Sequence, residues 1–213
     1  EDAITELPFP RDGRHLAAGE RLGALRLWTL ADGKSDALHR FQLAVTTVAF
    51  SPDGRALAAG SMDHTAWLHS LDTHTGHLLQ LGAAGAQVLR FSPDGQELFI
   101  ASMGDPTVRR WNARTGDPIS SLEGHQDYVL QLAFSPEGQR MATASVDGTV
   151  PVWDLKSGES RALRGHQGPV LQVAFSRDGR HVLSAGIDGT VRRWQDKLPL
   201  EPEALRAWLR HHA

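Results

Sequence analysis

The chain has 213 residues, a formal net charge of −3 at pH 7, 40 % hydrophobic residues and no cysteine. This length supports one or two domains with a buried core, and the composition is typical of a globular protein. The charge gives no electrostatic basis for binding nucleic acid or an anionic membrane, no run of about 18 apolar residues is present to span a bilayer, and disulfide and thiolate chemistry are excluded.

A repeat with a period of about 41 residues runs along the chain. A turn of an acidic residue and glycine returns at steps of 41, 41, 43 and 41 residues, at Asp12-Gly13, Asp53-Gly54, Asp94-Gly95, Glu137-Gly138 and Asp178-Gly179. An aromatic position keeps steps of 41, 42, 42 and 41 residues, at Trp28, His69, Trp111, Trp153 and Trp194. Two independent markers with one period predict five copies of a single structural unit.

The fourth copy shows most clearly what this unit is. The apolar run Val129–Phe134 is typical of a buried strand, and residues 141–145 and 149–153 form two more such runs. Asp147-Gly148 lies between those two runs, and both residue types accept the positive φ angles of a type I′ hairpin turn. A more polar strand follows at 161–163. Four short strands predict an antiparallel blade, which buries its faces only by stacking on neighbouring blades.

These copies resemble the WD-repeat β-propeller family over residues 3–195. The match is most specific in the fourth copy, with Gly124-His125, Asp147-Gly148-Thr149 and Val152-Trp153-Asp154, and nearly as good in the fifth. The resemblance implies an all-β propeller of four-stranded antiparallel blades, five in this chain, at about 1–41, 42–82, 83–123, 124–164 and 165–195. The linking phrases FSPDGR and FSPDGQ resemble those of bacterial members.

In this family each well-formed blade carries a buried chain of hydrogen bonds that joins Trp, Ser or Thr, Asp and His. Carried over to the fourth blade, the chain comprises Trp153, Thr143 or Ser145, Asp147 and His125. In the fifth blade it comprises Trp194, Ser184, Asp188 and His166. Buried indole and imidazole nitrogen atoms need such partners. Because the set recurs at the same place in two copies, we interpret it as a structural network and not as a catalytic triad.

The resemblance also implies an incomplete ring. We expect five blades to be the C-terminal portion of a larger, seven-bladed propeller; the alternative is a five-bladed ring that closes imperfectly. An open ring would expose two blade faces. Residues 196–213 are predicted to form a proline-containing linker and an amphipathic helix, because Pro202 suits a first helical turn and Leu205, Trp208 and Leu209 share one face. That helix either docks on the propeller or anchors a partner.

Two further patterns suggest ion binding. The one dense group of histidines comprises His64, His69, His74 and His77. They are predicted at opposite ends of a blade, whereas zinc ligands converge to within about 2.1 Å of one point. In the doublets Arg109-Arg110 and Arg192-Arg193, neighbouring side chains on a strand point to opposite faces, so we expect structural roles. We therefore predict no metal, no cofactor and no catalytic residue.

The strongest functional signal is a rim of mainly apolar residues at one end of the blades, which we call the top face. The resemblance implies that partners bind there, near the start of each inner strand and before each turn Asp. The implied contact residues are Tyr128, Leu130, Val146, Pro169, Leu171, Ile187, Thr46, Met62 and Leu89. Such a rim suits a protein or peptide partner. The alternative is that these side chains pack within their own blades.

The sequence therefore predicts a non-catalytic, cytoplasmic scaffold or sensor that binds a protein or peptide, with neither nucleic acid nor membrane as a partner. Two other functions stay open. One is a structural element that completes a larger propeller or multidomain assembly, with upstream blades or other domains of the same protein as partners. The other is an enzyme with a site in the central channel, which would need convergent acids or metal ligands there.

Overall fold

The computed structural model describes residues 3–10, 12–82 and 84–196, and these residues contain nineteen strands and no helix. Within these ranges nothing helical is long and apolar enough to cross a membrane. The helix predicted after Pro202 lies outside the described residues, which end at 196. The described residues cover nearly all of the five predicted repeats.

The strands form five antiparallel sheets, and each sheet is drawn from one repeat. The first sheet comprises β1 (Ile4–Glu6), β2 (His15–Glu20), β3 (Ala24–Thr29) and β4 (Lys34–Arg40). The second comprises β5 (Val45–Phe50), β6 (Ala56–Ser61), β7 (Thr65–Ser70) and β8 (Thr75–Gln80). The third comprises β9 (Ala86–Phe91), β10 (Glu97–Ser102), β11 (Val108–Asn112) and β12 (Pro118–Leu122). The fourth comprises β13 (Val129–Phe134), β14 (Arg140–Ser145), β15 (Thr149–Asp154) and β16 (Ser160–Arg164). The fifth comprises β17 (Val170–Phe175), β18 (His181–Gly186) and β19 (Val191–Gln195).

Strands that follow one another in the chain are neighbours in every sheet, so each sheet is an up-and-down meander. The predicted all-β fold of antiparallel blades is confirmed. Four of the sheets have the predicted four strands, and the fifth has three within the described residues.

Short hairpins join the second and third strands of each sheet, and the fourth sheet shows how the sequence makes them. Thr149 donates from its backbone N and from Oγ1 to Asp147 Oδ1, at 2.8 and 2.7 Å. Gly148 follows Asp147 with a φ of 79°, a conformation that L side chains rarely adopt. A Cβ at Gly148 would also lie 3.1 Å from the carbonyl O of Gly168, in the loop before β17. The Asp-Gly pair therefore sets the turn and lets adjacent loops pack closely.

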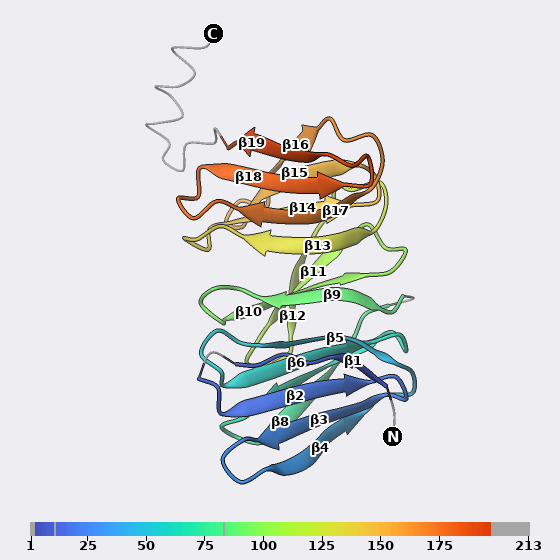
Figure 1. Cartoon of the computed structure of the whole chain (residues 1–213), viewed down its shortest axis with the longest axis vertical. Coiled ribbons are helices and arrows are strands. Elements are labelled where there is room, and N and C mark those ends of the chain that lie inside the picture. Colours follow the sequence, from blue (N-terminus) through green and yellow to red (C-terminus); the bar gives the residue numbers. More distant parts are fainter. Residues whose placement is uncertain (1–2, 11, 83, 197–213) are drawn as a thin grey trace.

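The sheets stack in chain order into an arc (Figure 1). β1 and β2 pack on β5, β5 and β6 pack on β9, β9 and β10 pack on β13, and β13 to β15 pack on β17. A cluster of buried apolar side chains lies in each of these four contacts: for example, Leu25 of the first sheet and Val45 of the second belong to one cluster. Stacking therefore supplies the core, as expected for blades that cannot bury both faces alone.

The arc is open within the described ranges. The first and fifth sheets lie at its opposite ends, and no comparable packing joins them (Figure 1). The alternative of five blades closing into a ring is therefore wrong. The seven-bladed total stays a prediction. Each end sheet keeps one face that no other sheet of the described chain covers.

Candidate functional site

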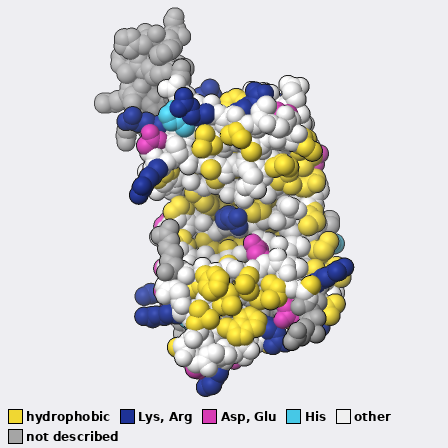
Figure 2. All heavy atoms as spheres, in the orientation of Figure 1, with side chains coloured by type: hydrophobic (Ala, Val, Ile, Leu, Met, Phe, Trp, Pro, Cys, Tyr) yellow, Lys and Arg dark blue, Asp and Glu magenta, His cyan; other side chains and the backbone are white. Residues whose placement is uncertain are grey.

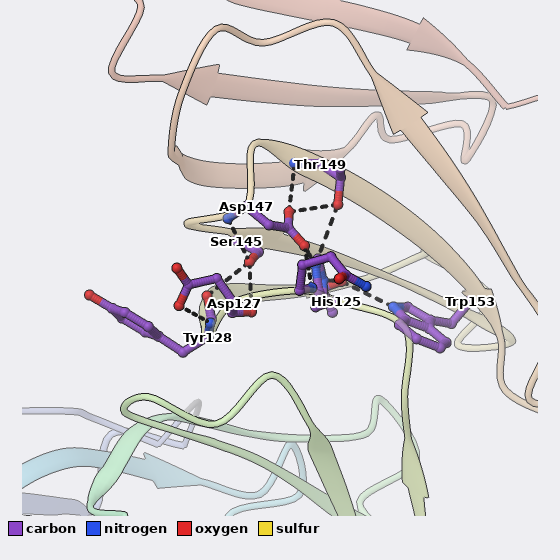
Figure 3. A network of polar contacts seen from close by, with 9 residues as sticks. His125, Asp127, Tyr128, Ser145, Asp147, Thr149 and Trp153 are labelled. Carbon is purple, nitrogen blue, oxygen red and sulfur yellow. Dashed lines mark hydrogen bonds and ion pairs between the residues drawn. The ribbon is translucent and has the colours of Figure 1, made fainter.

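The predicted polar network of the fourth sheet links four side chains, which come from the loop before β13, from β14, from the hairpin turn and from β15 (Figure 3). His125, in the loop before β13, lies 2.8 Å from Asp147 through Nδ1 and 2.7 Å from Thr143 Oγ1 through Nε2. Trp153 of β15 donates from Nε1 to the same Thr143 hydroxyl at 3.0 Å. A neutral imidazole that donates from Nδ1 to the carboxylate and accepts from the hydroxyl satisfies every contact.

The sequence left Thr143 and Ser145 as alternatives for the middle position, and the geometry places Thr143 there. Ser145 has another task, because its Oγ donates to the carbonyl O atoms of Asp127 and Tyr128, at 2.9 Å each. It also accepts from Asp147 N at 3.1 Å. Thr143 therefore holds His125, and Ser145 holds the loop two to three residues later, so neither substitutes for the other.

The fifth sheet repeats this network. His166 lies 3.0 Å from Asp188 through Nδ1 and 2.8 Å from Ser184 Oγ through Nε2. Trp194 Nε1 donates to the Ser184 hydroxyl at 2.8 Å. Both imidazole side chains are fully buried, so neither reaches a substrate in solvent. The duplicated and enclosed geometry supports the structural interpretation over the catalytic one.

The pKa of His125 is lowered from its ordinary value because burial disfavours the charged ring, and this effect outweighs the opposing attraction of Asp147. Burial would by itself raise the pKa of Asp147, but hydrogen bonds from Gln126 and Thr149 outweigh it and lower that pKa. The ionised carboxylate and the neutral imidazole are therefore the folded forms at neutral pH.

These shifts predict a loss of stability on acidification. Because the pKa of His125 is lower in the folded protein than the unfolded value of about 6.5, the unfolded chain takes up more protons as the pH falls below that value. Asp147 and Asp188 add a second loss below about pH 4, since their folded pKa values are also lowered. Thermal melts between pH 7.5 and 5 are expected to show a falling midpoint, with a shallower fall in His125→Asn. An equally steep fall of the midpoint in His125→Asn and in the wild type would contradict the role assigned to His125.

The second and third sheets keep only part of the network. In the second sheet Asp63 still accepts from Gln42 N at 2.8 Å. The residue before Gln42 is buried Phe41, whereas the residue before the equivalent Gln126 of the fourth sheet is His125. In the third sheet Ile100 replaces the hydroxyl residue, as the pairing of β10 with β11 shows. Trp111 Nε1 is consequently buried with no hydrogen-bond partner, which disfavours folding by about 1–3 kcal/mol.

The doublet Arg109-Arg110 serves the blades. Arg109 Nη1 donates to Asp105 at 2.7 Å and braces its own hairpin turn. Its neighbour Arg110 points to the other face, where it pairs with Glu97 at 2.8 Å and donates to the carbonyl O of Leu155 in the fourth sheet at 3.2 Å. The opposite orientations follow the alternation predicted for a strand.

Side chains that could hold a metal ion are not clustered in the described ranges. No three His, Asp or Glu side chains in that part of the chain are grouped as for a metal ion. At the end of the blades opposite the top face, a groove of about 730 Å³ contains Asp53 and Asp94. Each of these carboxylates is bound within its own turn, by Ser51 Oγ at 2.6 Å and Ser92 Oγ at 2.5 Å. They therefore stabilise the repeated turns.

The structure exposes some of the predicted top-face residues and encloses others. Ile187 is 66 % exposed, and Leu171 and Met62 are 45 % and 44 % exposed. Five are partly buried at the same loops and strand starts, namely Tyr128, Leu130, Val146, Pro169 and Thr46. The Tyr128 ring points away from the polar network (Figure 3). The Thr46 hydroxyl is used inside the protein, donating to the carbonyl O of Ala86 in the next sheet at 2.7 Å.

The prediction that Leu89 contacts a partner on the top face is wrong. The Leu89 side chain is 0 % exposed and belongs to the core between the second and third sheets. Leu89 follows Val88 of β9 and is equivalent to buried Leu132 of β13, since the turn marker steps by 43 residues between these copies. The residue equivalent to Leu130 is Gln87, two positions earlier.

Two exposed apolar residues of the top face were missed by the sequence analysis. Leu22 is in the hairpin turn between β2 and β3, at the position that Asp147 occupies in the fourth sheet. Leu43 lies two residues before β5, as Asp127 does before β13. A leucine in place of a turn carboxylate was the signal that could have identified Leu22.

Comparison with known proteins gives three matches to the family model described as "WD domain, G-beta repeat", at residues 37–70, 116–154 and 158–195, together about half of the chain. The chain is 41 % identical over 61 residues to "Target of rapamycin complex subunit wat1" of Schizosaccharomyces pombe, which is 28 % of this chain and 19 % of that protein. It is 45 % identical over 58 residues to human "Coronin-7", 27 % of this chain and 6 % of that protein. It is 38 % identical over 60 residues to "Target of rapamycin complex subunit LST8" of Saccharomyces cerevisiae, 27 % of this chain and 20 % of that protein.

The matched segments span a fifth or less of each of these relatives. All three come from eukaryotes, so they lend no support to the expected likeness to bacterial members. The matched range 116–154 contains His125, Asp147 and Trp153 of the fourth-sheet network. On this evidence the chain belongs to the WD-repeat family.

Proposed function

We propose that this chain is a non-catalytic interaction module that binds a protein or peptide on its top face. The observation that carries the proposal is the set of exposed apolar side chains on the loops and strand starts at that end of the blades: Leu22, Leu43, Met62, Leu171 and Ile187. Exposed apolar groups gathered at one end of a rigid scaffold are typical of interaction sites, and side chains at the centre of such sites contribute most of the binding energy.

The scaffold beneath these residues supports the same proposal. Asp147 accepts from Gln126 N at 2.9 Å, and Asp188 accepts from Gln167 N at 2.9 Å, so each carboxylate ties the entry loop of its blade to its hairpin turn. Tyr128 and Ile187 belong to those tied segments. A surface held rigid before binding loses less conformational entropy on binding.

The relatives agree with a role in assemblies, because wat1 and LST8 are both named as complex subunits. An enzyme with a channel site is the less favoured function, since the predicted contact residues are mainly apolar and the recurring His and Asp side chains are enclosed. A cytoplasmic location is part of the proposal and rests on the cysteine-free sequence.

A structural role in a larger assembly has a separate observation in its favour. The outer faces of the first and fifth sheets carry exposed apolar residues, among them Ile4 and Val191. An assembly of that kind would form at those faces and leave the top face unused.

The test of the top-face proposal combines Tyr128→Ala with Leu171→Ala. Recovery of partners with the tagged chain from cells is expected to fall sharply, because two such contacts at about 1–2 kcal/mol each weaken binding by about 30-fold or more. Ile119→Ala is the control, since Ile119 is about as exposed as Leu171 but lies on the outer strand β12, away from the top face. Equal recovery of partners by the double variant and the control would contradict the proposal.

A further inference from the structure

The turn between β6 and β7 of the second sheet has a histidine where three other sheets have glycine. His64 has a φ of 71°, in the left-handed region that L side chains rarely adopt. The equivalent residues of the first, fourth and fifth sheets are Gly23, Gly148 and Gly189, each with a positive φ. The imidazole of His64 is exposed, and within the described residues it makes no hydrogen bond or ion pair. No contact inside this part of the chain accounts for the histidine.

Two exposed apolar side chains lie beside this turn. Met62 and Leu43 are 44 % and 53 % exposed. Their segments are joined, because Met62 N donates to the carbonyl O of Ala44 at 3.0 Å and Ser61 Oγ donates to the carbonyl O of Leu43 at 3.2 Å. This end of the blades is on the right in Figure 1, where β2 ends and β13 begins, and hydrophobic side chains line the same margin in Figure 2.

We call Leu43, Met62 and His64 the second-sheet patch. The second sheet has a neighbouring sheet on each side, so the patch is exposed although both faces of its own blade are covered. Its three side chains come from a loop and a turn that hydrogen bonds hold together, and the patch therefore presents a fixed arrangement of apolar groups and one imidazole.

The carboxylate within this turn is already occupied. Asp63 accepts from Gln42 N at 2.8 Å, and from Thr65 N and Oγ1 at 3.1 and 2.6 Å. These bonds tie the turn to the loop before β5 and use the acceptor capacity of Asp63 inside the protein. The imidazole beside it is thus left to bind an acceptor from outside the chain.

The elements packed around the turn add no competing acid. The loop before β9 contacts the turn through Leu81 N, which donates to the carbonyl O of His64 at 3.0 Å, and residues 81–85 include no titratable side chain. On the first sheet, Arg40 at the end of β4 is exposed, and His39 is stacked on an indole of the second sheet. The surroundings of the patch therefore favour a ligand with a negative charge.

We propose that the second-sheet patch binds a peptide segment in which a carboxylate stands next to an apolar side chain. The apolar side chain packs on Leu43 and Met62, and the carboxylate accepts a hydrogen bond from the His64 imidazole. This inference rests on the proposed top-face function and names the chemistry of its ligand. A ligand of this kind accounts for a strained histidine at a position where glycine would carry no strain.

The probe is a library of six-residue peptides that place one aspartate beside one leucine among neutral polar residues. A second library has asparagine in place of the aspartate. Binding to the full chain is followed at pH 6 through the methyl signals of its three methionines in NMR, with buried Met141 as the internal reference. The aspartate library is expected to shift the Met62 signal and to bind about 10-fold more tightly than the asparagine library, because charge-assisted hydrogen bonds are the stronger ones. Equal affinities, or no shift of the Met62 signal with about 1 mM peptide, would overturn the proposal.

His64→Gly is expected to weaken binding of the aspartate library about 10-fold. The unfolding midpoint is not expected to fall, since glycine adopts this φ readily. His74→Gly is the matched control: His74 is also exposed, with a φ of 54°, but it lies in the turn between β7 and β8 at the opposite end of the blade. The control is expected to keep the wild-type affinity. An equal loss of affinity in the two variants would overturn the proposal, and so would full affinity in His64→Gly.

The pH dependence of binding gives an independent readout. Imidazole changes its charge between pH 5 and 8, so the wild type is expected to bind the aspartate library more tightly at pH 6 than at pH 7.5. His39 and Arg40 are retained in His64→Gly, which is nevertheless expected to lose this dependence. A pH dependence that His64→Gly keeps in full would overturn the proposal.

Recovery of partners from cells distinguishes this inference from the proposed function. Full recovery with His64→Gly, together with reduced recovery with the double variant Tyr128→Ala and Leu171→Ala, would overturn the inference alone. Full recovery with His64→Gly and with the double variant would overturn both.

Discussion

Thr143→Val is expected to lower the free energy of unfolding by about 2–4 kcal/mol, although valine has nearly the same shape as threonine. The Thr143 hydroxyl accepts from Trp153 Nε1 and bonds His125 Nε2, and all three side chains are buried. Its removal leaves two buried nitrogen atoms without a partner, at about 1–3 kcal/mol each. Urea denaturation followed by circular dichroism measures the change.

Ile100→Val is the matched control for that substitution. Ile100 stands at the equivalent position of the third sheet, where Trp111 Nε1 already has no partner. The control removes one buried methyl group and no hydrogen bond, so a loss of about 0.5–1.5 kcal/mol is expected. A Thr143→Val loss no greater than that of the control would show that the network contributes nothing beyond packing.

Arg140→Met is expected to lower the free energy of unfolding by about 3–5 kcal/mol, because it removes one partner from a buried set of charges. The Arg140 side chain is only 6 % exposed. It pairs with Glu137 at 2.6 Å, contacts Asp196, and donates to the carbonyl O of Gly179 in the fifth sheet at 2.9 Å. Hydrogen exchange is expected to accelerate most in β17 to β19, since those strands lose their tie to the fourth sheet.

Arg55→Met provides the comparison for Arg140. Arg55 pairs with Asp72 at 3.8 Å, and both side chains are mostly in solvent, so the expected loss is about 0–1 kcal/mol. Similar losses in the two variants would contradict the view that Arg140 joins the last two sheets.

The repeat made much of this fold predictable. Turn and aromatic markers at one period indicated five units, and the strands of the fourth unit appear where its apolar runs stand, at Val129–Phe134 for instance. His125, Asp147 and Trp153 could be placed together because strand pairing and a tight turn fix their separation. The choice between Thr143 and Ser145 was not predictable, because both are small hydroxyl residues on the same face of β14 and only their distance along the strand from His125 and Trp153 distinguishes them.

The top face was less predictable than the network. Leu89 was chosen in place of Gln87, two residues earlier on the same strand. This shift moves the chosen position along the blade into the core, and the apolar pattern of the sequence does not reveal it. Leu171 and Leu130 occupy equivalent positions, yet Leu171 is 45 % exposed and Leu130 only partly so. Sequence periodicity gives the two leucines the same position and therefore does not reveal this difference in exposure.

The most direct test of the central claim places a photo-crosslinking amino acid at single positions of the full chain in cells. Crosslinks to a partner are expected from position 187 on the top face and not from position 119 on β12, although Ile187 and Ile119 are both well exposed. Crosslinks from 119 with none from 187 would contradict top-face binding.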